Sequence, residues 1–300
     1  NSPRKMETTM LERHYDRAAQ DIGNIINLGH VNVAISDQHV ATNYYVTGLG
    51  LTRDPFLMTG SGNMWINVGM SQFHLPIGKP EVLRGVTGLV IPDREALLAR
   101  LANARKLLAG TKFDFRESND CVETVCPWGN RIHVHTPDEE RFGRVALGMA
   151  YVRFDVRPGT TEHIVRFYRD VLRTNADLVR NGAGPEARVQ VGEKQYFYFR
   201  ETDATEAAYD NHHVQIYLAD FSSPYRRLKE LGLISMETND HEYRFLDVID
   251  LDTREPLFRV EHETRSMTNP MYGRPLVNRN PAVTNMDYKP GHDSMSWALS

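Results

Sequence analysis

The chain has 300 residues, of which 41% are hydrophobic and 25% charged, and its net charge is −4, as in a globular protein of one large or two ordinary domains. The scattered Lys and Arg residues do not predict a nucleic-acid partner, and no apolar run approaches the roughly 20 residues of a membrane helix. The start shows no signal-peptide pattern. The only two cysteines, Cys121 and Cys126, are typical of a reduced cytoplasmic protein, although they could pair across a hairpin.

The first 27 residues are predicted to form an N-terminal helix, because Tyr15, Ala18, Ile22 and Ile25 recur at roughly helical spacing. Four similar units follow, and each reads as a strand, a helix and three further strands. We name them unit A (28–78), unit B (84–137), unit C (146–200) and unit D (211–264). The predicted first strands are 30–35, 86–91, 149–156 and 213–218, and the predicted helices are 37–47, 93–108, 160–172 and 222–231.

A unit of this kind has one open sheet face that it cannot bury alone, so the units must pair into cups. The sequence therefore predicts an α+β protein with four βαβββ modules paired into two cup-shaped sheets. The expected domains are the N-terminal helix 1–27, tandem modules A and B over 28–137, tandem modules C and D over 146–264, and an extended C-terminal arm over 265–300. Apolar residues among the prolines of this arm predict that it covers a module surface, a neighbouring subunit or the mouth of a cup.

The most informative feature is a pair of histidines at matching positions of units A and D. His30 heads the first strand of unit A and His213 heads that of unit D, while His74 and Glu261 lie on the last strands of the same units. Because alternate residues of a strand share a face, each strand-heading histidine points away from its apolar neighbours and toward the cup. Repeated units that offer ligands from their first and last strands predict two halves of one metal site.

Further motifs recur in register with these strands. The first helices of units A and C end in Tyr44-Tyr45…Leu49-Gly50 and Phe167-Tyr168…Leu172, and the turn Pro127-Trp128-Gly129-Asn130 precedes the last strand of unit B. With the histidines, they resemble the vicinal oxygen chelate superfamily, which includes glyoxalase I, extradiol catechol dioxygenases and bleomycin-resistance proteins. The resemblance covers about residues 28–264. It implies the fold and metal ligands on the first and last strands of two paired modules, but one fold hosts many chemistries.

The resemblance leaves two module pairings open. If A pairs with B and C with D, as in extradiol dioxygenases, the A/B cup lacks a carboxylate and the C/D cup has Met149 where a dioxygenase has its first histidine. If A pairs with D and B with C, as in fused glyoxalases, one cup collects all four strong ligands. We favour the second pairing, which places together His30, His74, His213 and Glu261.

The resemblance also suggests how these donors would be used. His30, His213 and Glu261 form a two-histidine, one-carboxylate triad that leaves positions open on Fe(II), and Fe(II) is the favoured metal, with Zn, Ni, Co or Mn also compatible. His74 is either a fourth ligand or a residue that orients the ligands.

Three other residues are alternatives to this set. His212 could replace His213 through a slip of one residue, and Glu263 could replace Glu261. His133, on the last strand of unit B, faces a cup that offers few other ligands, so a role in the core is favoured for it.

Four more side chains are candidates for catalysis or for contact with a substrate. His241 and Tyr243, on the third strand of unit D, could act as acid/base groups, with a solvated hairpin as the alternative. Trp65 and Tyr217 could contact a substrate ring, with packing as the alternative. The expected partner is a small molecule, aromatic in the favoured reading, and the chain is expected to form a homo-oligomer.

Three functions follow from these residues. The first is a metal-dependent, ring-cleaving type of dioxygenase that uses Fe(II). The second is a glyoxalase-type isomerase or lyase, with His74 as a fourth ligand to Zn, Ni or Co. The third is a metal-free protein that binds or sequesters small molecules.

Overall fold

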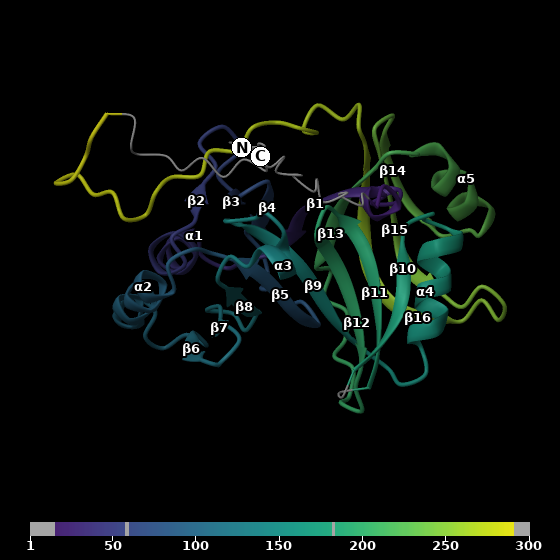
Figure 1. Ribbon diagram of the computed structural model, residues 1–300, viewed down its shortest axis with the longest axis horizontal. Coiled ribbons are helices and arrows are strands. Elements are labelled where there is room, and N and C mark those ends of the chain that lie inside the picture. The colour runs from purple at the N-terminus through teal and green to yellow at the C-terminus, as the bar shows by residue number, and fades with distance from the viewer. Residues whose placement is uncertain (1–15, 58–59, 182–183, 291–300) are drawn as a thin grey trace, which may run out of the picture.

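The computed structural model describes residues 16–57, 60–181 and 184–290. In the described part of the chain, sixteen strands form two eight-stranded sheets, and the longer helices lie at the two ends of the molecule (Figure 1). Among the described residues, no helix is long and apolar enough to cross a membrane. Cys121 and Cys126 are both buried and unpaired, so the hairpin disulfide does not form.

The four predicted modules are present, and each has the order strand, helix and three strands. Unit A contains β1 (Ile25–Asn32), α1 (Gln38–Ala41) continued by the π-helical segment η2 (Thr42–Gly48), β2 (Thr52–Arg53), β3 (Asn63–Val68) and β4 (Ser71–Pro76). Unit B contains β5 (Gly85–Val90), α2 (Arg94–Leu107), β6 (Asp114–Glu117), β7 (Val122–Val125) and β8 (Arg131–His135).

The second half of the chain repeats this order after a short helix, α3 (Glu139–Phe142). Unit C contains β9 (Gly148–Val156), α4 (Thr161–Asp170), β10 (Ala176–Asn181), β11 (Gly184–Gly192) and β12 (Gln195–Glu201). Unit D contains β13 (His213–Leu218), α5 (Ser222–Glu230), β14 (Ile234–Asn239), β15 (Glu242–Ile249) and β16 (Pro256–Ser266).

The modules pair A with D and B with C. One sheet has the order β14-β15-β16-β13-β1-β4-β3-β2, and the other has the order β10-β11-β12-β9-β5-β8-β7-β6. Within the first sheet, the antiparallel pair β1–β13 joins unit A to unit D. Within the second sheet, the antiparallel pair β5–β9 joins unit B to unit C. This confirms the pairing that collects the candidate ligands in one cup.

The predicted N-terminal helix is wrong where the structure describes it, and residues 1–15 lie outside the described part. Residues 16–27 contain only a 3-10 turn, η1 (Ala18–Gln20), before β1 begins at Ile25. Ile25 pairs with Leu218 of β13 and is fully buried. The apolar spacing that resembled a helix is therefore satisfied by a strand, because backbone pairing with a distant segment outweighs a weak local periodicity.

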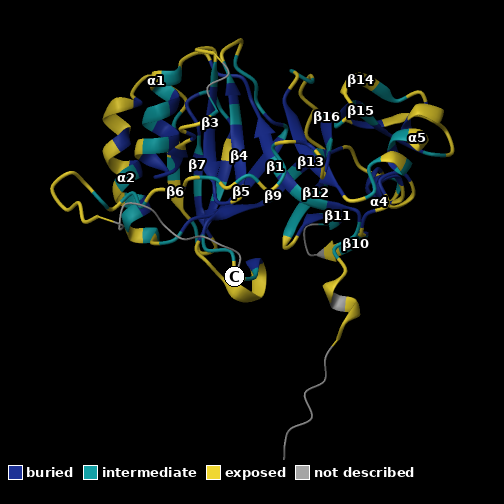
Figure 2. Cartoon of the chain, turned by 90° about the horizontal axis from the view of Figure 1, so that it is seen from above, coloured by how far each residue is buried: buried dark blue, intermediate teal, exposed yellow. Residues whose placement is uncertain are grey.

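The hydrophobic core lies between the sheets and their helices. Buried strands fill the middle of the molecule, while α1, α2 and α5 keep exposed outer faces (Figure 2). Tyr44, Tyr45, Phe167 and Tyr168 are all fully buried, which explains the aromatic pairs near the helix ends. The apolar side chains of each strand point into this core layer. Because successive side chains point to opposite faces of a sheet, the other side chains of the A/D sheet point to its concave face.

The chain after β16 crosses the molecule from unit D to unit A (Figure 1). We call residues 267–279 the strap. Asn278 is its firmest attachment, since its side chain accepts from Gly69 N at 3.1 Å and donates to Gly69 O at 2.9 Å. Asn67 donates to Val277 O at 2.9 Å and Arg274 donates to the buried Asp54 at 2.7 Å. The strap, which is the first part of the predicted C-terminal arm, therefore lies on the mouth of the A/D cup.

Candidate metal centre

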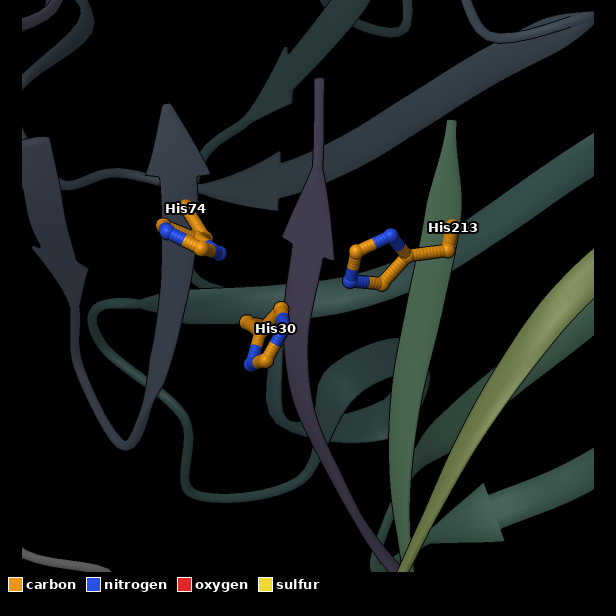
Figure 3. Close-up of side chains that lie close together, drawn as sticks. All are labelled: His30, His74 and His213. Carbon is orange, nitrogen blue, oxygen red and sulfur yellow. The ribbon is translucent and has the colours of Figure 1, made fainter. Parts of the chain in front are cut away.

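His30, His74 and His213 come together on three neighbouring strands of the A/D sheet (Figure 3). One ring nitrogen of each lies within 4.8 Å of the others. The ring centroids of His30 and His213 are 5.7 Å apart, and those of His30 and His74 are also 5.7 Å apart. Residues more than 180 positions apart in the sequence thus share one cup, as the matched strand positions predicted.

The strand register gives the A/D cup an approximate two-fold symmetry. His30 pairs with Gln215 and Asn32 pairs with His213 across β1 and β13, so the two histidines occupy equivalent places. In the outer strands, Asn32 pairs with His74 and Gln215 pairs with Glu263. His74 of β4 and Glu263 of β16 are therefore equivalent, whereas Glu261 corresponds to Gln72.

Glu263 is the carboxylate that faces both strand-heading histidines. Its Oε2 atom lies 3.8 Å from His30 Nε2 and 3.3 Å from His213 Nε2. Glu261 is farther along β16, where its Oε2 lies 3.7 Å from His213 Nδ1 and accepts a hydrogen bond from Arg244 at 2.8 Å. The geometry thus favours Glu263 over the predicted Glu261. Sequence alone could not choose, because residues two apart on a strand share a face.

Two arginines hold the Glu263 carboxylate in place. Arg244 donates to its Oε2 at 2.7 Å, and Arg265 lies 2.5 Å from its Oε1. Glu242, which is buried, accepts from both arginines. Although burial alone would raise the pKa of Glu263, the contact with His213 and the two guanidinium groups hold that pKa well below its usual range. The carboxylate is therefore ionised at neutral pH.

These three donors fit a divalent metal. Within the described residues, the Nε2 atoms of His30 and His213 are buried and have no hydrogen-bond partner of good geometry. Burial lowers the pKa of His30 well below its ordinary value, which leaves the neutral imidazole that a metal requires. Nitrogen and oxygen atoms 3.3 and 3.8 Å apart are close to the separation of neighbouring ligands on one ion with bonds of about 2.1 Å.

His74 is already engaged by two asparagines. Its Nδ1 lies 2.7 Å from Asn32 Nδ2, and its Nε2 lies 3.0 Å from Asn63 Oδ1. The ring stacks on Trp65 at 3.9 Å, and burial lowers the pKa of His74 to about 4. This arrangement favours an orienting role for His74 over a direct bond to a metal. Trp65 supports the histidine, rather than standing free for a substrate ring.

The other predicted site residues fall in different places. Tyr243 is buried on the opposite face of β15, where its hydroxyl donates to Phe221 O at 3.3 Å and its ring contacts Phe221 and Tyr225. This packing contradicts the acid/base role proposed for Tyr243. His241 is half-buried in the β14–β15 turn, and its Nδ1 lies 3.1 Å from Thr268 Oγ1. Tyr217 faces the concave side, where its ring meets Tyr272 of the strap at 5.0 Å.

The other module pair differs in its donors, and unit B brings together Asp120, Cys121 and His135 as a second group of possible metal ligands. The register places Tyr151, rather than Met149, opposite Gly88 in the place that His213 occupies in the A/D cup. Tyr151 lies between His135 Nε2 at 3.0 Å and His133 Nδ1 at 3.4 Å. Burial lowers the pKa of His133 to about 4. A tyrosine thus fills the space of a ligand, as expected for a cup in which His133 has no matching partner.

His212 is not an alternative to His213. It points away from the cup, is fully buried, and its Nδ1 lies 2.6 Å from Asp210 Oδ1.

Sequence reasoning overlooked several polar side chains of the cup. Arg244, Arg265, Gln72 and Gln215 all face the candidate site or the space beside it. A signal was available for three of them, because Gln72, Gln215 and Arg265 each lie two residues from His74, His213 or Glu263 on an alternating strand.

Solved structures share this architecture. No protein-family model matches the chain, and no curated protein matches it in sequence. Glyoxalase I from Zea mays superposes with a TM-score of 0.55 at 15% identity, covering 80% of this chain and 92% of that chain. A candidate dioxygenase from Bacillus subtilis superposes with a TM-score of 0.53 at 13% identity, covering 83% and 87%. At these identities the likeness establishes the fold alone, and this chain shares that fold with glyoxalase I and with the Bacillus subtilis protein.

Proposed function

We propose that the chain is a metal-dependent enzyme whose metal is held by His30, His213 and Glu263. The observation that carries the proposal is the convergence of two unpartnered, buried Nε2 atoms on one ionised carboxylate. A purely structural cluster would use those nitrogens in hydrogen bonds, because an unsatisfied buried polar atom is costly.

Within this class, a dioxygenase of the ring-cleaving type is favoured. Two histidines and one carboxylate are the triad that leaves three positions open on Fe(II), and the asparagine contacts of His74 argue against a fourth protein ligand. When bound, the metal would polarise substrate oxygen atoms as a Lewis acid, and iron would add redox chemistry with dioxygen. Arg244 and Arg265 keep the carboxylate oriented, and the buried position of His30 excludes bulk water from one side.

The second candidate is a glyoxalase-type isomerase or lyase. It is favoured by the A/D module pairing and by the symmetric equivalence of His74 and Glu263, which would give two ligands from each module. It requires His74 to leave one asparagine and turn to the metal. A metal-free binding protein, the third candidate, does not explain why two buried Nε2 atoms meet an ionised carboxylate in the described part of the cup.

Elemental analysis of freshly purified protein tests the proposal. The wild-type chain should carry about one divalent metal ion, and His213→Ala should lose it because two donors hold such an ion poorly. The variant Tyr243→Phe, on the opposite face of the sheet, should keep it. Iron with oxygen consumption on a panel of catechols favours the dioxygenase, and Zn, Ni or Co without oxygen consumption favours the isomerase. Full metal occupancy in His213→Ala would refute the site.

A further inference from the structure

A partly open chamber of about 600 Å³ adjoins the candidate metal centre. His30 and Gln215 form its inner wall, and the strap covers it through Tyr272, Arg274 and Leu276. Unit C contributes the start of β9 and the turn before β12, so the chamber lies where the two sheets meet. Its size suits a small organic molecule, because binding cavities for such ligands typically measure about 300–1,000 Å³.

The walls of the chamber carry buried polar atoms that lack a hydrogen-bond partner in the protein. Among the described residues these atoms are Gln215 Nε2, His30 Nε2, Arg274 Nε and Asn27 Oδ1. Gln215 is only 1% exposed and His30 only 2%, so bulk water does not account for them. Gln215 Nε2 and Arg274 Nε can only donate hydrogen bonds, so they call for a ligand that supplies acceptor atoms.

A glycine makes the position of Gln215 possible. Gly29 forms a bulge in β1, where the register with β13 shifts between Leu28 and His30. A Cβ atom on Gly29 would lie 1.8 Å from Gln215 Oε1. The side chain of Gln215 therefore lies against the bare backbone of β1, with its amide nitrogen left for the chamber.

The lining of the chamber combines charged and apolar side chains. Arg265, Arg274 and Lys194 carry positive charge and Glu193 carries negative charge, and the apolar lining residues include Ile22, Ile26, Met70, Leu147, Met149 and Met271. Arg274 donates a hydrogen bond to Asp54, and Arg265 donates one to Glu242. The excess of positive charge favours an anionic ligand group, and the apolar residues favour a hydrocarbon body.

We propose that this chamber is the substrate site, and that the substrate is a carboxylic acid with an apolar body. The carboxylate oxygens accept hydrogen bonds from Gln215 Nε2 and Arg274 Nε, and the apolar body lies between the methionines and the strap. This substrate class rests on the proposed function, since His30 is shared by the chamber and the metal centre.

Three probes test the inference in metal-free protein by isothermal titration calorimetry. 4-Phenylbutyrate has both parts, 4-phenyl-1-butanol lacks the carboxylate, and butyrate lacks the apolar body. The first should bind at least about tenfold more tightly than either of the others, as expected when a charge-assisted hydrogen bond or a buried ring is lost. Gln215→Leu should lower the affinity for 4-phenylbutyrate by about tenfold or more, because the substitution removes the hydrogen-bond donor and keeps a similar side-chain volume.

The matched control is Gln190→Leu, on β11 outside the chamber, which should bind 4-phenylbutyrate like the wild type. If Gln215→Leu does not fold, Gly29→Ala displaces the same side chain and should have the same effect. Equal affinity for the acid and the alcohol, or unchanged affinity in both Gln215→Leu and Gly29→Ala, overturns the inference.

Metal content separates this inference from the proposed function. Gln215→Leu should retain its metal ion, and metal-depleted His213→Ala should still bind 4-phenylbutyrate. Selective binding by a protein that carries no metal would support the chamber and refute the metal site. A metal-loaded protein that binds none of the three probes would refute the substrate class alone.

Discussion

At the scale of single residues, the choice of carboxylate decides the site. Glu261 and Glu263 face the same cup, and Arg244 contacts both. Only Glu263 lies within reach of the Nε2 atoms of both His30 and His213.

Glu263→Gln should therefore weaken metal binding more than Glu261→Gln. Loss of a group that only orients a ligand typically costs about 10–100-fold in metal affinity, and loss of a ligand should exceed about 100-fold. Competition with a chelator, followed by elemental analysis, measures both affinities. A larger loss in Glu261→Gln would restore the carboxylate expected from the sequence.

His74 distinguishes the two enzyme candidates. Because both of its ring nitrogens contact asparagines, His74→Ala should still bind about one metal ion per chain, with an affinity lowered no more than about 100-fold. Asn63→Ala, which frees His74 Nε2, is the companion variant. Complete loss of metal in His74→Ala would instead favour four ligands and the isomerase-type candidate.

At the scale of elements, the strap joins the last strand of unit D to unit A. Its attachments at Gly69, Asn67 and Asp54 lie on or beside β2, β3 and β4, and Tyr272 contacts Tyr217 of β13. These contacts favour a cover for the chamber over an arm for a neighbouring subunit. The bulge at Gly29 is a second local feature beside the cup, whereas the π-helical segment η2 packs against α2 and belongs to the core.

Asn278→Ala should loosen the strap, because it removes both hydrogen bonds to Gly69. We expect weaker binding of 4-phenylbutyrate, an unchanged oligomer by light scattering, and a loss of unfolding free energy of about 1–3 kcal/mol. A chain ending at Thr268, which keeps β16 and the contact with His241, should show the stronger effect. A shift to smaller species in either protein would identify the strap as an oligomerisation arm.

At the scale of the whole molecule, both sheets bury neutral histidines. His262 is fully buried between Tyr168, whose hydroxyl lies 2.7 Å from its Nε2, and Phe245, on which it stacks at 4.2 Å. Burial lowers the pKa of His262 to about 3, and that of His133 in the other sheet to about 4. An unfolded histidine has a pKa of about 6.5.

The unfolded chain therefore binds more protons than the folded chain below pH 6.5, so stability should fall as the pH drops from 6.5 toward 4. Each fully buried histidine contributes a slope of up to about 1.4 kcal/mol per pH unit. Urea unfolding of metal-free protein at pH 7.5 and pH 5.0 measures the effect. His262→Phe should reduce the pH dependence, and substitution of the exposed His39 should not. Equal urea midpoints at the two pH values for the wild type would contradict this account.

The sequence by itself determined the modules and the two central histidines. Alternation along strands and apolar spacing along helices are local properties, so the order of elements and the inward direction of His30 and His213 could be read from neighbouring residues. The same alternation, followed two residues further, would have found Gln215 and Arg265, and the aromatic character of Tyr243 and Phe245 would have placed Tyr243 in the core.

Only the tertiary structure decided which modules pair, which glutamate faces the histidines, and what covers the cup. These outcomes depend on hydrogen bonds between strands that are far apart in the chain. The register of β13 with β16 places Glu263 beside the histidines. The pairing of β1 with β13 places Ile25 in a strand, although its local sequence pattern predicted a helix. The contacts of His74 with Asn32 and Asn63, and of the strap with Gly69, likewise join distant segments. Local patterns favour an element and a face, but they do not determine the register between elements.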